Sequence, residues 1–138
     1  MEKKDIEYTL NEEHLKKFET FGRYYETLFG LSDWGIYYRL PSCDEDREHI
    51  VGNKAFVCSD RIGMTASIVL SPVWPLTEPT DENLRDSALH EVLHLVLIPL
   101  NSLATYRFSV NEEDIGTEVH RIIRKIAWAI TKTTGEIL

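Results

Sequence analysis

Residues 88–98 constrain the fold of this chain more than any other segment. They are apolar except for His90, Glu91 and His94. A run of this length with so few polar side chains is typical of a buried helix. In a helix, His90 and His94 share one face about 6 Å apart along the axis, and Glu91 lies about 100° round from His90. Because buried polar groups need partners, these three side chains must share a ligand or find hydrogen bonds in the core.

The spacing His-Glu-x-x-His, which runs from His90 to His94, indicates a metal site. Two neutral imidazoles one turn apart can bind one zinc ion, and a catalytic zinc keeps a coordination position open for water. Glu91 follows the first histidine directly and is placed to act as the general base for that water. The pattern therefore predicts one zinc ion per chain. The alternative is a core helix in which His90 and His94 hydrogen-bond only to main-chain carbonyls.

A third protein ligand has to come from another part of the chain. Glu118 is the preferred candidate, because it lies one helical turn from Ile115 and Ile122, on the flank of an expected apolar stripe. An unpaired carboxylate there would be costly. A salt bridge within the same helix is the alternative for Glu118. His120 is the rival ligand, although a helical wheel turns it away from the stripe.

The composition fits one soluble domain over residues 1–138. The chain has 138 residues, 43% of them hydrophobic, and a net charge of −8. This acidity argues against nucleic acid as the main partner. The charged start, residues 1–5, lacks the apolar core of a secretion signal, and no apolar stretch is long enough to span a membrane. We expect a cytoplasmic protein with no membrane partner, whose two cysteines, Cys43 and Cys58, are free thiols.

The pattern of apolar residues and turn signals predicts an α+β fold with an N-terminal helix, three strands, an active-site helix and a C-terminal helix. The first helix is expected over residues 12–29, with Asn11 as its cap and Gly30 as its stop. Strands are expected at 34–40, 54–59 and 64–71, with an exposed loop at 41–53 and a hairpin turn at 60–63.

The second half of the chain is expected to be helical. Prolines at 71–79 predict that the chain leaves the sheet there. The active-site helix should begin near Thr80 and end before Pro99, because proline restricts the residue that precedes it. A connector is expected at 100–111 and a last helix at 112–133.

The motif from His90 to His94, followed by a glutamate on a later helix, resembles the zincin metallopeptidases of the gluzincin type. The whole chain is similar to small predicted metallopeptidases of bacteriophages and prophages. The similarity is carried by residues 34–38, 66–71, 90–100 and 116–119. It implies a minimal zincin fold, with a short twisted sheet packed on the active-site helix, and the host cytoplasm as the location if a phage encodes the chain.

The resemblance also implies roles for other residues. Zincins often supply a donor for the oxyanion, for which Tyr106 and Arg107 are the candidates; the alternative for Tyr106 is an aromatic that covers the core. In zincins the strand before the active-site helix forms a sheet edge that pairs with extended peptide. This assigns substrate binding to residues 64–71, including Ile68, Val69 and Leu70, unless that strand is an inner one.

These observations predict a zinc-dependent peptidase acting on a protein or peptide substrate. The zinc ion would activate water and Glu91 would carry the proton to the leaving amine. The competing hypothesis is a zinc-stabilised interaction module without catalysis, and a less favoured one is a structural protein without metal.

Overall fold

The computed structural model describes residues 6–131, except 61, 109–112, 114–115, 118, 121, 125 and 128–129. For residues 99–108 it describes the backbone alone. The elements are β1 (Glu7–Thr9), α1 (Glu12–Leu28), β2 (Gly35–Arg39), α2 (Asp44–Ile50), β3 (Ala55–Asp60), β4 (Thr65–Leu70), β5 (Val73–Pro75) and α3 (Asp81–Phe108). The described residues of 113–131 are also helical. The predicted α+β class is therefore confirmed.

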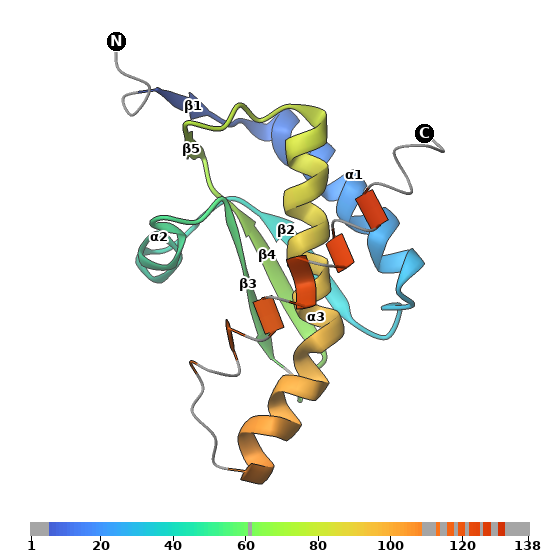
Figure 1. The fold of residues 1–138 in the computed structure, drawn as a ribbon. Coiled ribbons are helices and arrows are strands. Elements are labelled where there is room, and N and C mark those ends of the chain that lie inside the picture. Colours follow the sequence, from blue (N-terminus) through green and yellow to red (C-terminus); the bar gives the residue numbers. More distant parts are fainter. Residues whose placement is uncertain are drawn as a thin grey trace.

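A three-stranded mixed sheet in the order β2-β4-β3 forms the centre of the fold (Figure 1). β4 pairs in parallel with β2 and antiparallel with β3, which confirms that β3 and β4 form the predicted hairpin. β4 is therefore the inner strand, and both of its backbone edges are already paired. The prediction that residues 64–71 form a free sheet edge is wrong, because β4 lies between β2 and β3.

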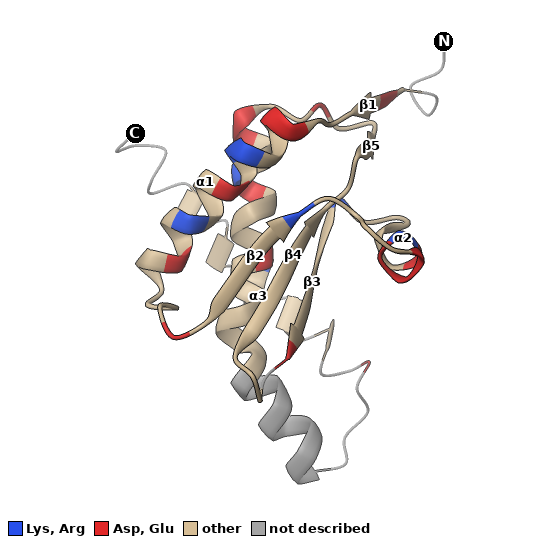
Figure 2. Cartoon of the chain, turned by 180° about the vertical axis from the view of Figure 1, so that it is seen from behind, with Lys and Arg blue, Asp and Glu red and all other residues tan. Residues whose placement is uncertain are grey.

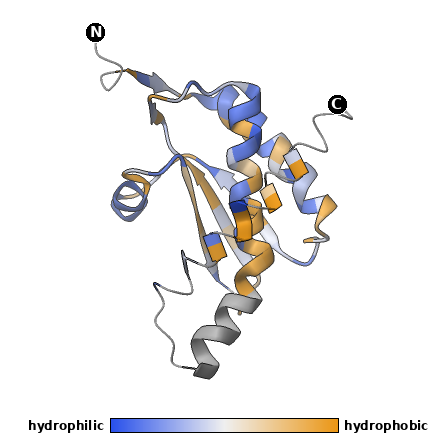
Figure 3. Cartoon of the chain, in the orientation of Figure 1, coloured by the Kyte–Doolittle hydropathy of each residue, from blue (hydrophilic) through white to orange (hydrophobic). Residues whose placement is uncertain are grey.

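Both long helices lie on one face of this sheet (Figures 1 and 2). Alternate residues of the strands, such as Ile36, Ala66 and Ile68, are buried toward them, as the period of two in a strand requires. α3 sends Leu84, Ala88 and Leu93 into the same core. Figure 3 shows the apolar residues concentrated in β4 and the central turns of α3. This packing explains why residues 88–98 of α3 are apolar apart from the His-Glu motif.

The ends of the first helix follow its sequence signals. The Asn11 side chain accepts hydrogen bonds from the backbone of Glu13 and His14, while the His14 ring accepts one from the backbone of Asn11. At the other end Gly30 has a φ of 67°, which is the left-handed conformation that ends many helices. The predicted cap and stop are confirmed.

Two local predictions are wrong. The chain does leave the three-stranded sheet at 71–79 as predicted, although β5 in this segment pairs with β1 in a separate two-stranded sheet. The expected loop at 41–53, by contrast, contains α2, and its Asp46 is buried against Arg39 of β2. α3 continues past Pro99 to Phe108, where a connector was expected. Proline removes one helical hydrogen bond, but its φ suits a helix, and the apolar residues before it keep α3 packed on the core.

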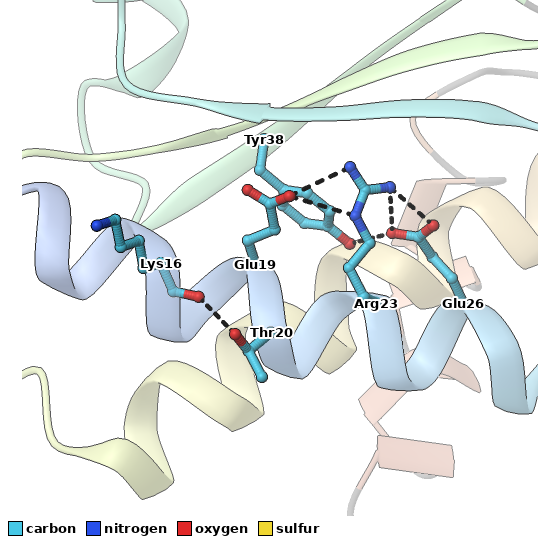
Figure 4. Close-up of polar contacts among 6 residues, drawn as sticks. All are labelled: Lys16, Glu19, Thr20, Arg23, Glu26 and Tyr38. Atoms are coloured by element: carbon cyan, nitrogen blue, oxygen red, sulfur yellow. Dashed lines mark hydrogen bonds and ion pairs between the residues drawn. The ribbon is translucent and has the colours of Figure 1, made fainter.

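A close approach between α1 and β2 fixes the helix on the sheet. A Cβ atom at Gly22 would lie 2.1 Å from the Tyr38 hydroxyl oxygen, so only glycine leaves room for the ring. The Tyr38 hydroxyl donates a hydrogen bond of 2.6 Å to Glu26, and Arg23 bridges Glu19 and Glu26 beside it (Figure 4). Burial and this hydrogen bond raise the pKa of Tyr38, which keeps the phenol neutral.

We expect Gly22→Ala to destabilise the protein by about 1–3 kcal/mol, because the methyl group overlaps the Tyr38 ring. The overlap must outweigh the gain of roughly 1 kcal/mol that alanine brings to a helix interior. Gly116→Ala is the matched control, since a Cβ there meets nothing within 4 Å. Urea unfolding of both variants measures the difference. Equal stability changes in the two variants would contradict the close approach.

The ion pair between Arg39 and Asp46 attaches α2 to the sheet. Arg39 holds the pKa of the Asp46 carboxyl well below its usual value of 3.8, helped by the backbone N–H of Ser42. A carboxylate with a lowered pKa stabilises the fold above its unfolded pKa, and this stability is lost as the pH falls below about 4.

We therefore expect Asp46→Asn to lower the melting temperature at pH 7 and to have a smaller effect at pH 3. Asp44→Asn is the control, because Asp44 lies on the same helix but is solvent-exposed. Thermal unfolding at both pH values is the measurement. A deficit in Asp46→Asn that is the same at pH 3 and pH 7 would show that the charge of Asp46 is not what matters.

Candidate metal centre

α3 presents His90, Glu91 and His94 toward β3 and the helical residues of 113–131. The flanking Val92, Leu93 and Leu95 are buried in the core, and their packing fixes the rotation of α3 about its axis. His90 and His94 are half-buried at the border of this core. The Nε2 atoms of the two rings lie 3.3 Å apart, as the motif predicts for residues one turn apart.

His120 joins this pair from the last helical segment. One nitrogen of each of the three rings lies within 4.8 Å of the others, so the three histidines form a possible metal site. The ring centres of His120 and His94 are 4.7 Å apart, and those of His120 and His90 are 5.5 Å apart. Among the described residues, these three histidines are the group whose potential ligand atoms lie close enough together to hold one metal ion.

The donor set fits zinc. Two nitrogen ligands of a tetrahedral zinc ion, each about 2.0–2.1 Å from the metal, lie about 3.3 Å from one another, which matches the distance between His90 and His94. Burial lowers the pKa of both rings, that of His94 to about 4, with smaller contributions from neighbouring charges. Both are neutral at neutral pH and have a lone pair to donate. His120 is exposed.

Glu91 lies beside the three rings but is more deeply buried, with 6% of its surface exposed. Burial raises the pKa of its carboxyl to about 8. A carboxylate removed from water is a stronger base than one on the surface, and a cation at the histidines would favour its ionised form. Glu91 is thus the described acidic group best placed to exchange protons with a molecule at the site.

The histidines open into a cleft of about 350 Å³ between α3, β3 and the last helical segment. Its apolar lining residues include Val57, Leu97, Ile98 and Val119. Asn53, His90 and His120 line both this cleft and a neighbouring hollow that includes Arg124. β3 is an outer strand of the three-stranded sheet and contributes residues to the wall of the cleft.

The structure brings together some of the predicted site residues and separates others. His90, Glu91 and His94 lie together. Glu118 lies outside the described residues, so its assignment as third ligand stays a prediction. Tyr106 and Arg107 lie in α3 rather than in a connector, and their side chains are not described. Their assignment as oxyanion donors also stays a prediction.

Ile68, Val69 and Leu70 are fully buried in β4. They do not line the cleft, which is bordered by β3 instead. The assignment of substrate pairing to β4 is therefore corrected, because an inner strand has no free backbone groups to offer.

On a helical wheel His120 points away from the apolar stripe, but the structure places it at the site. Its neighbour Val119 packs against the core, so His120 lies at the edge of the buried face, within reach of α3. Asn53 and Val57 were missed as cleft residues. The signal that could have found them is the short hairpin, which makes β3 an outer strand.

Fold and site together define an α+β domain with a candidate three-histidine metal centre between α3 and the last helical segment. Searches of protein-family models, curated proteins and solved structures found no match to this chain. Of the described helices, none combines the length and apolar character that a membrane crossing requires.

Proposed function

We propose that the chain is a zinc-dependent peptidase in which His90, His94 and His120 hold the metal and Glu91 is the general base. The observation that carries the proposal is the convergence of three imidazoles beside a buried carboxyl group at the wall of a cleft. A zinc site that served only to stabilise the fold would be closed by four protein ligands. Here three described ligands lie at an open cleft, which is typical of a catalytic site.

The residues of the chain would have the following roles in the reaction. Zinc, when bound, acts as a Lewis acid that makes water more acidic and polarises a carbonyl group. Glu91 takes a proton from the attacking water and delivers it to the leaving amine. The apolar residues around Glu91 exclude bulk water, which strengthens the interactions of its charge. Among the described residues, β3 pairs with a strand on one side only, and its other edge would offer backbone groups to an extended peptide.

The proposal is tested by hydrolysis of an unstructured peptide mixture by the purified chain. We expect the protein to bind zinc at close to one ion per chain and to generate new peptide termini that mass spectrometry detects. A chelator should abolish this cleavage, and added zinc should restore it. A protein that holds one zinc ion per chain but cleaves no peptide would refute the peptidase and favour the interaction module.

A further inference from the structure

One charged side chain at the cleft has no role in the proposed reaction. Arg124 lines a hollow together with His90, His120, Asn53 and Thr117, and this hollow shares its two histidines and Asn53 with the cleft. It follows His120 by four residues, and both lie in the same helical segment. Residues at this spacing share a helix face, so Arg124 and His120 point to the same side.

Arg124 differs from three other arginines of this acidic chain. Arg23, Arg39 and Arg47 each form an ion pair with a nearby acid. Within the described part of the chain, Arg124 has no hydrogen bond or ion pair. A guanidinium group presents five donors in a planar fork that matches a carboxylate. An unpaired fork beside a candidate metal centre is available to a ligand.

The cleft and the neighbouring hollow offer different chemistry to that ligand. The cleft includes Leu97, Ile98 and Val57, which suit an apolar side chain. The hollow includes Arg124 and Asn53, which provide donors. Glu113 borders the same hollow as Arg124. An anion there would be attracted by Arg124 and repelled by Glu113, which restricts the positions that the anion can take.

From this arrangement, and resting on the proposed function, we infer that Arg124 binds a carboxylate group of the substrate next to the reacting bond. The preferred substrates would be peptides with a carboxylate on the Asn53 side of the metal and an apolar side chain on the Leu97 side. The carboxylate is either the C-terminus of the peptide or an acidic side chain. These two sources share the same chemistry and are separated by the experiment.

The experiment measures binding rather than turnover. Three peptide-like probes share a zinc-binding hydroxamate and a leucine side chain. The first ends in a carboxamide, the second ends in a free carboxylate, and the third carries a glutamate side chain and ends in a carboxamide. Calorimetry with the zinc-loaded full chain gives the dissociation constant of each probe.

We expect one acidic probe to bind about tenfold more tightly than the neutral probe, which corresponds to about 1.4 kcal/mol. In Arg124→Gln this ratio should fall to near one, whereas Arg124→Lys should keep part of it. Arg47→Gln is the matched control, because it removes the same charge from α2, away from the cleft. Whichever probe is preferred identifies the source of the carboxylate.

Equal affinity for all three probes in the wild-type protein would overturn the inference, as would a preference that survives Arg124→Gln. Zinc content is measured in each variant, so that loss of the metal is not mistaken for loss of the anion site. A protein that cleaves peptides but shows no preference refutes only the role of Arg124. A protein that shows the preference but cleaves nothing refutes only the peptidase.

Discussion

Replacing Glu91 with glutamine is expected to reduce peptide hydrolysis by about 10²–10⁴-fold, the range that loss of a general base typically produces. Glutamine has nearly the same size and fits the same buried position, but it cannot accept the proton of the attacking water. Zinc content should stay at about one ion per chain, since the three histidines are untouched.

This result separates catalysis from metal binding. Glu82→Gln is the matched control, because Glu82 lies in the exposed first turn of the same helix. Peptide cleavage rates and metal analysis are measured on the same preparations. Full activity in Glu91→Gln would show that another group moves the proton, and would remove Glu91 from the mechanism.

The second large effect is expected from the histidines. Replacing His94 or His120 with alanine should lower zinc affinity by at least about 100-fold, because even outer-shell changes typically cost 10–100-fold and a lost ligand costs more. Competition with a coloured zinc chelator measures these affinities. His49→Ala is the control, since His49 is exposed on α2 and lies outside the candidate site.

The same titration decides between the two candidates for the third ligand. If His120 is the ligand, His120→Ala should lose zinc and Glu118→Ala should keep it. The reverse pattern would restore Glu118 and leave His120 as a neighbour of the site. Loss of zinc in both variants would indicate that the two side chains act together.

The comparison of sequence and structure shows where local patterns are sufficient. The first helix, its Asn11 cap and its Gly30 stop were predicted because each depends on residues within a few positions. The hairpin between β3 and β4 was predicted for the same reason. α2 was missed because its short polar sequence has no apolar stripe, and its attachment depends on Arg39, which lies in another element.

Pairings between distant segments could not be read from the sequence. β1 and β5 are three residues each and are strands only because they pair with one another across more than sixty residues. The position of β4 between β2 and β3 depends in the same way on the path of the chain. Because β4 is the inner strand, the sheet edge that we propose for peptide binding is that of β3 rather than β4.

By itself, the sequence determined that His90 and His94 face the same way and that Glu91 lies beside them, because helical geometry fixes positions four residues apart. Only the tertiary structure decided that His120 meets them and that Arg124 borders a hollow next to the cleft that β3 lines. Those positions depend on how α3, the sheet and the last helical segment pack against one another. Packing brings together residues that are far apart in the sequence, and their separation in the sequence does not predict their distance in space.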